Sequence, residues 1–379
     1  MKLKSAVFVL LVAGLVLAVF EVSKAVVDLR RIEEVLKKNV LTQQDLQIID
    51  EFMNDAVTDL VRTTDFTQVS KTRTIIVSHQ SSQAQYAQQF SESAYRHVAE
   101  GLQEAKTGIR DEIRRFKVIA NLLILVDRLK DPRLTDLAIT EIRHPNSAVR
   151  YWAVRAATDA GLWAKLSQDQ SAAAQIAGRI LTECGAVVDQ SSPEVLHLMA
   201  EFAGRSQTAE AERLLLQIAD ARIGSYADWS VKYELMDSAI LRLLGDKLVA
   251  GGPSNPQLAK RFGQLFSFVL QRYMAGQRDG AIKAASANYL ISVMMEAEEK
   301  CLGRLLGTPQ ATIRRAVEAK DLGALQAEHD RLLGTGNQAG SLSAKFSVSY
   351  GPEGENHPAP LTLPNRPRRT ASNSQDAQK

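Results

Sequence analysis

Cysteine and aromatic residues are scarce in this chain of 379 residues. The sequence contains two cysteines, Cys184 and Cys301, and aromatic residues make up 6% of it. Each cysteine lies in a separate segment with a helical, apolar pattern, so we expect buried free thiols, although an exported protein could pair them. Because aromatic residues are few while Ala, Leu and Gln are abundant, the composition favours helices over a β-sandwich.

Sequence motifs of catalysis and cofactor binding are also missing. The six histidines are scattered, and neither His-Glu-x-x-His nor Gly-x-Ser-x-Gly occurs. The glycines from Gly334 to Gly340 have the wrong spacing for a dinucleotide loop and follow a predicted helix. We therefore predict no catalytic residue, no metal, no cofactor and a protein that is not an enzyme. A site assembled from helices far apart in the sequence stays open as an alternative.

A strong excess of charge of either sign is absent as well. The formal net charge is +3, and residues 1–25 contribute three lysines and one glutamate to it. The rest of the chain is therefore almost neutral. A neutral protein has no general electrostatic attraction for nucleic acid, so we predict no nucleic-acid partner.

The first 25 residues have the pattern of an export signal. Lys2 and Lys4 precede an uncharged apolar run from residue 5 to residue 20, and Ser23 and Ala25 supply the small-x-small pattern of a cleavage site. The alternative is an uncleaved membrane anchor, for which the run is slightly short. In either case we expect the bulk of the protein outside the cytoplasm, as a periplasmic, secreted or membrane-anchored protein.

Residues 26–116 show the apolar spacing of long helices. Thr42 and Asp45 resemble a capping box at the start of a helix over 43–62. Apolar residues then recur in steps of three or four over residues 82–123, which predicts one long helix, bent at a glycine, that pairs with 43–62 as an antiparallel, coiled-coil-like hairpin. Residues 74–77 are predicted to be a short extended piece or a loop.

From residue 117 to residue 333 shorter apolar helices alternate with proline and glycine. In the segment 144–161, Pro145, Val149, Arg150, Ala153 and Ala157 follow the pattern of the first helix of a HEAT repeat. This segment therefore resembles the HEAT and HEAT-like (PBS-lyase-type) repeat family. The resemblance implies an α-solenoid of stacked helix pairs that binds other proteins. The full prediction is an all-α fold: a long helical hairpin, then stacked helix pairs, then a tail over 334–379.

The tail is rich in Pro, Ser, Asn and Gly and keeps no apolar period. It cannot bury enough apolar surface to order itself, so we predict disorder from residue 334 onward. Within the helical part, aromatic and basic residues are candidates for a groove, with core packing as the competing interpretation. The candidate groove contacts are Arg150, Tyr151, Trp152, Arg155, Trp229 and Lys232.

Three functional hypotheses follow from the sequence. The first is a non-enzymatic interaction module or scaffold outside the cytoplasm, with another protein or peptide as its partner. The second is an enzyme or ligand-binding protein with a site built from distant helices. The third is a membrane-tethered structural protein, in which residues 5–20 form the anchor and the only contact with the membrane.

Overall fold

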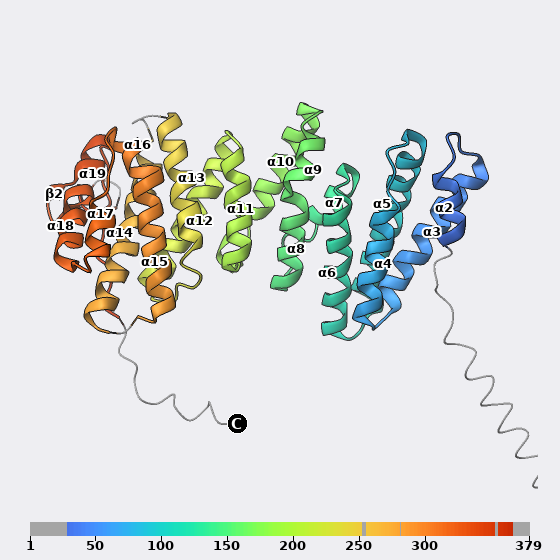
Figure 1. Ribbon diagram of the computed structural model, residues 1–379, viewed down its shortest axis with the longest axis horizontal. Helices are drawn as coiled ribbons and strands as arrows, with labels where there is room; N and C mark the ends of the chain where they lie inside the picture. The colour runs from blue at the N-terminus through green and yellow to red at the C-terminus, as the bar shows by residue number, and fades with distance from the viewer. Residues whose placement is uncertain (1–28, 252–254, 281, 353–354, 367–379) are drawn as a thin grey trace, which may run out of the picture. The chain divides into compact units, whose positions relative to one another are not determined.

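The protein is all-α, as predicted, apart from one small pair of strands. The computed structural model describes residues 29–251, 255–280, 282–352 and 355–366. The predicted signal or anchor, with Ser23 and Ala25, lies outside the described residues. The chain forms two compact units whose boundary falls between Gln170 and Ser171. Figure 1 shows the helices of each unit.

The first unit consists of helices that pack in alternating order. In chain order they are α2 (Leu29–Leu36), α3 (Gln43–Arg62), α4 (Phe66–Ser78), α5 (Ala84–Gly108), α6 (Glu112–Leu129), a 3₁₀ turn (Pro132–Leu134), α7 (Thr135–Ile139), α8 (Ser147–Thr158) and α9 (Ala160–Leu166). Helix α3 packs on α5, α4 packs on α6, and α6 also packs on α5 and α8. This is the arrangement of helix pairs stacked one behind the next.

The start of α3 confirms the predicted cap. Thr42 accepts a hydrogen bond from the backbone of Asp45, and the Asp45 side chain accepts one from the backbone of Thr42. The apolar residues of this helix at spacings of three and four, among them Ile49 and Met53, are buried. Local capping and burial therefore agree about where this helix begins and which side it buries.

Two expectations for the first unit, the single helix over 82–123 and the extended residues 74–77, need correction. The predicted single helix over 82–123 is two helices, because Ile109 is extended and Asp111 caps a new helix by accepting from the backbone of Arg114. Residues 74–77 are helical and belong to α4. Helix α6 runs through the position of the predicted domain boundary at residues 116–117 and packs on helices from both sides of it.

The second unit begins with α10 and repeats the alternating order. Its helices are α10 (Gln170–Gly185), a 3₁₀ turn (Val188–Gln190), α11 (Pro193–Arg205), α12 (Ala209–Ala227), α13 (Met236–Gly251), α14 (Pro256–Arg278), α15 (Ala284–Ala297), a π-helical turn (Glu298–Leu302), α16 (Gly303–Leu306), α17 (Thr312–Glu318) and α18 (Leu322–Leu333). Helix α11 packs on α12 and α13, and α12 also packs on α14. Pro193 lies in the first turn of α11 and Ser192 is its N-cap residue, although the Ser192 side chain makes no capping hydrogen bond.

A regular spacing links alternate helices of the second unit. Arg242 on α13 pairs with Glu201 on α11 at 2.7 Å, and Arg261 on α14 pairs with Asp220 on α12 at 3.0 Å. In both pairs the partners are 41 positions apart in the chain. The pair α11–α12 and the pair α13–α14 are therefore offset by the same length of sequence in both of these contacts.

Part of the segment predicted to be a disordered tail is ordered. Residues 334–352 and 355–366 are described, and they include strands β1 (Gly334–Thr335) and β2 (Gln338–Ala339), which pair antiparallel, and helix α19 (Ser341–Phe346). Apolar side chains of these residues are buried, namely Leu342, Phe346, Val348, Tyr350 and Leu363. The segment orders because α14 and α18 give it a surface to cover, and the sequence composition alone does not reveal that surface.

Both cysteines are buried free thiols, which confirms the expectation. Burial raises the pKa of Cys184 above its ordinary value and that of Cys301 to about 12. Both therefore stay protonated and weakly reactive at neutral pH.

Candidate functional site: the polar face of helix α14

Helix α14 lies inside the second unit and is buried on most of its circumference. It packs on α12, α13, α15, α18 and α19. One line of polar residues interrupts its apolar surface, at spacings of four, three and four, and these residues are Lys260, Gln264, Ser267 and Gln271. Such spacing places side chains on a single side of a helix. Buried polar groups need hydrogen-bond partners, so this line predicts a specific polar contact.

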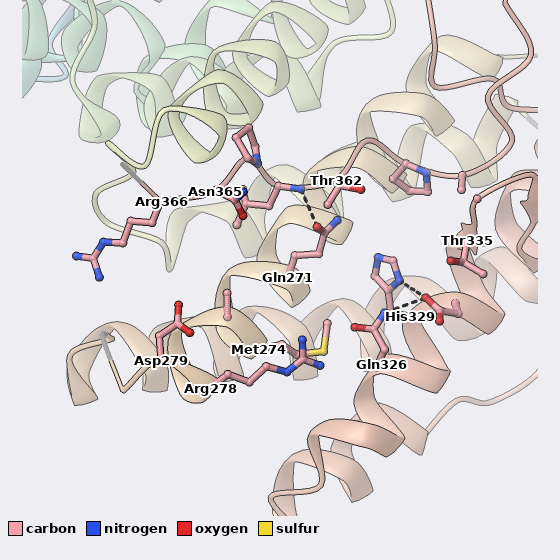
Figure 2. A pocket seen from close by; sticks show the side chains of 18 of the residues that line it. Gln271, Met274, Arg278, Asp279, Gln326, His329, Thr335, Thr362, Asn365 and Arg366 are labelled. Carbon is pink, nitrogen blue, oxygen red and sulfur yellow. Dashed lines mark hydrogen bonds and ion pairs between the residues drawn. The ribbon is translucent and has the colours of Figure 1, made fainter. Parts of the chain in front are cut away.

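The contact is made with an extended segment near the end of the chain, residues 355–366, which we call the strap. Gln264 is bidentate to Leu361: its Nε2 donates to the Leu361 carbonyl at 3.1 Å, and its Oε1 accepts from the Leu361 N–H at 2.8 Å. Gln271 accepts from the Leu363 N–H at 2.7 Å and donates to the Leu361 carbonyl at 3.3 Å. Figure 2 shows Gln271 bound to the strap.

These bonds recognise the backbone of the strap. Every strap atom that Gln264 and Gln271 contact is an amide N–H or a carbonyl oxygen. Lys260 adds a bond of 2.7 Å to the carbonyl of Gly351, just before the strap. The polar face of α14 is therefore built to hold a chain in extended form, because only an extended chain presents such groups at this spacing.

A loop between α12 and α13 supplies an aromatic residue to the same site. Trp229 Nε1 donates to the carbonyl of Pro364 at 2.8 Å. The Arg272 guanidinium lies 4.3 Å from the centre of the Trp229 ring, and that of Arg366 lies 5.9 Å from it. Contacts of this kind between a cation and an aromatic ring are favourable, so the loop holds the end of the strap through both a hydrogen bond and stacking.

This loop is held in an unfavourable backbone conformation. Trp229 and Tyr233 have φ values of 58° and 54°, which are rare for bulky residues. The buried Arg222 fixes the loop, since it donates to the Lys232 carbonyl at 3.1 Å and forms two bonds, of 2.7 and 2.9 Å, with Asp237. Strained residues that their surroundings hold in place cluster at functional sites, and here the strain presents Trp229 to the strap.

Ser267 begins a second series of hydrogen bonds that links α14 to α18. Its Oγ lies 2.8 Å from His329 Nε2, and His329 Nδ1 lies 2.9 Å from Asp330 Oδ1. Gln271 donates to the same Ser267 oxygen at 2.8 Å. This order of groups matches that of a serine hydrolase triad. Ser267 is 0% exposed, however, so no external molecule reaches its oxygen in this state.

A cleft of about 320 Å³ lies beside the strap. The second half of α14 lines it, together with α18, the turn after β1 and the strap itself. Its charged groups are of both signs and include Arg278, Asp279, Asp330 and Arg366, with His329 between them. Figure 2 shows Thr362 and Gln271 on one side of this cleft and Gln326 and His329 on another.

The six predicted groove contacts divide between the two units. Trp229 belongs to the strap site, and the exposed Lys232 lies in the same loop, where its carbonyl accepts from Arg222. The other four, Arg150, Tyr151, Trp152 and Arg155, are all on α8 in the first unit.

Three of the four residues on α8, namely Tyr151, Trp152 and Arg155, form a small cluster of their own. Arg155 lies 5.4 Å from the centre of the Trp152 ring and bonds to Tyr151 at 3.3 Å and to Asp127 at 3.4 Å. Arg150 is 2% exposed, so it is not available as a groove contact. The sequence argument missed Gln264, Gln271 and His329, although the polar interruption of the apolar helix at residues 264–271 was visible.

In the described part of the chain, no group of three or more His, Cys, Asp or Glu side chains could hold a metal ion. None of the helices between residues 29 and 366 that the structure describes is both long and apolar enough to span a membrane. No protein-family model, curated protein or solved structure matches this chain.

Proposed function

We propose that the protein is a non-enzymatic scaffold outside the cytoplasm that binds an extended segment of another protein along α14. The observation that carries this proposal is the pair of glutamines, Gln264 and Gln271, which bind the backbone of an extended chain in place of particular side chains. Backbone hydrogen bonds of this kind supply affinity in peptide recognition, while neighbouring pockets supply selectivity.

The stacking of the helices supports a HEAT-like scaffold. The 41-residue offset between paired helices, seen for Glu201 with Arg242, is of the length expected for such repeats. In α8 the residues of the family pattern, Val149, Ala153 and Ala157, are fully buried, as close packing of a neighbouring helix requires. The proposal assigns the helix pairs a supporting role and the polar face of α14 the binding role.

A selection experiment tests the scaffold proposal. Random extended peptides on phage are selected against the full-length chain, and enriched clones are counter-tested on the double variant Gln264→Ala, Gln271→Ala. The matched control is Gln326→Ala, which removes a glutamine that lines the same cleft but bonds to Asp330 and not to the strap. We expect enriched clones to bind the wild type and the control but not the double variant. Enrichment that the double variant retains, or none at all, would refute the proposal.

A second candidate function rests on the Ser267–His329–Asp330 series. If the strap moves away, Ser267 could attack an ester or amide carbonyl through Oγ while His329 Nε2 takes its proton and passes it to the leaving group. A fluorophosphonate probe tests this candidate. Labelling that Ser267→Ala abolishes supports a serine hydrolase, whereas an unlabelled wild type and an unlabelled strap-released variant argue against it.

The proposed location depends on residues 1–25, whose pattern is that of an export signal. N-terminal sequencing of the protein from its native cells tests it. A chain that begins at Val26 supports cleavage and export and excludes the membrane-tethered alternative. A chain that retains residues 5–20 in a membrane fraction supports the anchor.

A further inference from the structure

The strap shows which kind of segment the polar face of α14 accepts. This inference rests on the proposed function and adds the chemistry of the partner. We infer that the partner presents an extended segment of the form Pro-x-x-Leu-Pro-x-Arg, and that residues 360–366 of the strap occupy its place. The argument depends on which strap positions need a backbone N–H, which are buried and which are stacked.

The prolines stand only where no N–H is required. Gln264 and Gln271 accept from the N–H groups of Leu361 and Leu363, so neither of these positions can be proline. Pro360 and Pro364 flank them and restrict the chain to extended conformations. The segment is therefore extended before it binds, which lowers the entropy cost of holding it.

Burial distinguishes the two leucines. Leu363 is 9% exposed, whereas Leu361 is 49% exposed. The backbone N–H groups of both leucines are hydrogen-bonded to glutamines of α14, so the two positions differ in the burial of the side chain. Selectivity for an apolar side chain is thus expected at the position of Leu363, and tolerance is expected at the position of Leu361.

The end of the segment is recognised by Trp229. The Pro364 carbonyl accepts from the indole N–H, and the Arg366 guanidinium lies over the ring. A basic or other flat cationic group three positions after the buried leucine fits this contact, because a cation favours the face of an indole.

Polar contacts hold most of the strap, and little apolar surface is buried with it. Within residues 355–366, Leu363 is the only buried residue that the structure describes. The preceding residue Tyr350, by contrast, is 3% exposed and fixes the point from which the strap extends. A tethered segment acts at an effective concentration of about millimolar, so a free segment of the same pattern competes once the strap is loosened.

Releasing the strap in the full-length chain tests the inference. The probe is a fluorescent peptide with the sequence of residues 358–366, and its binding is followed by anisotropy. The variant Leu363→Asp places a charge in the buried position and frees the site, so we expect it to bind the peptide roughly 10- to 100-fold more tightly than the wild type does. The matched control Leu361→Asp alters the exposed leucine and is expected to behave like the wild type.

Specificity is tested with altered peptides and a second substitution. A peptide with Asp at the position of Leu363 should not bind, and one with Ala at the position of Arg366 should bind more weakly. Adding Gln271→Ala to Leu363→Asp should remove the gain in affinity. Circular dichroism of each variant confirms that the helices are intact, because the strap itself contains no helix.

The outcomes separate this inference from the proposed function. If the folded Leu363→Asp chain binds peptides from the phage selection but not the strap peptide, the inference is overturned while the scaffold proposal survives. If it binds no extended peptide, both fail. Light scattering tests a third outcome, in which two chains exchange straps. If the variant forms a dimer that the peptide dissociates, the site accepts a second copy of this chain, and the proposed partner is wrong.

Discussion

Three ion pairs, two in the first unit and one in the second, differ in how far they are removed from water. In the first unit a buried carboxylate is paired with a half-exposed lysine: Asp45 pairs with Lys38, whose side chain is 48% exposed, and Glu141 pairs with Lys106, which is 40% exposed. In the second unit both partners of the Arg222–Asp237 pair are buried, at 2% and 0% exposure. A pair that is fully removed from water demands good geometry and further hydrogen bonds.

The difference in burial corresponds to the part of the fold that each pair stabilises. Asp45 caps a regular helix, whereas Arg222 and Asp237 hold the irregular loop that presents Trp229. In the two first-unit pairs the lysine stays half-exposed, so each buried carboxylate is matched by a charge that remains in contact with water. The second unit uses buried polar groups where the chain departs from helix, and the candidate site lies at that place. The comparison predicts that a substitution in the fully buried pair is costly, whereas one in an exposed pair is mild.

Asp237→Ala should have the largest effect. It leaves the buried Arg222 guanidinium and the Tyr226 hydroxyl without their shared acceptor. Loss of one partner of a buried pair costs about 3–5 kcal/mol, so we expect the free energy of unfolding of the second unit to fall by that amount. Urea denaturation measures it. Hydrogen exchange should show the loss in α12 and α13 and not in α3, and a loss below about 1 kcal/mol would contradict the comparison.

Gly263→Ala should have the next-largest effect on stability, because Tyr350, which precedes the strap, packs against α14 at this glycine. A Cβ at this position would lie 2.1 Å from the Tyr350 hydroxyl oxygen. Alanine favours the helix by roughly 1 kcal/mol, but overpacking costs typically about 1–3 kcal/mol. We expect net destabilisation in thermal unfolding and faster proteolysis after residue 346.

The matched control for Gly263→Ala is Gly178→Ala in α10. A Cβ at Gly178 meets nothing within 4 Å, so the propensity gain is unopposed. We expect this variant to be more stable than the wild type by about 0.5–1 kcal/mol. If both substitutions stabilise the protein equally, Tyr350 is not packed on α14 as described.

The regular helices could be predicted from the sequence, and the site could not. The stripe that contains Ile49 and Met53, together with the Thr42 cap, gave α3 its bounds, because period and capping are local properties. The break after Gly108 was missed because an aspartate cap, Asp111, competes with an unbroken apolar period. The strap was missed because its partners are two glutamines more than 90 positions away in the chain, and they bind its backbone, so no side chain of the strap indicates which residues of α14 it contacts.

The pH dependence of α3 sharpens the comparison within the first unit. Hydrogen bonds from Lys38 and Thr42 lower the pKa of Asp45 from 3.8 to about 2. A lowered pKa in the folded state means that the carboxylate stabilises the fold above pH 3.8 and that this contribution is lost as the pH falls towards 2. We expect amides of the first turn of α3 to lose protection between pH 4 and pH 2, as measured by NMR hydrogen exchange.

The control for that titration is Asp45→Asn, which cannot titrate. Its first-turn amides should be less protected than those of the wild type at pH 5 and should show no further loss between pH 4 and pH 2. An unchanged titration in the variant would mean that another carboxylate governs this helix end.

Glu92→Gln should have the smallest effect. Glu92 pairs with Arg133 at 2.9 Å, and their side chains are 48% and 49% exposed. Like Glu201 and Arg242 in the second unit, the two residues are 41 positions apart, so a comparison of Glu92→Gln with Glu201→Gln compares equivalent pairs. Exposed pairs contribute only about 0.2–1 kcal/mol because water screens them. A change beyond that range in urea denaturation, or one that persists in high salt, would show that the first unit also depends on its charges and would remove the contrast with Asp237.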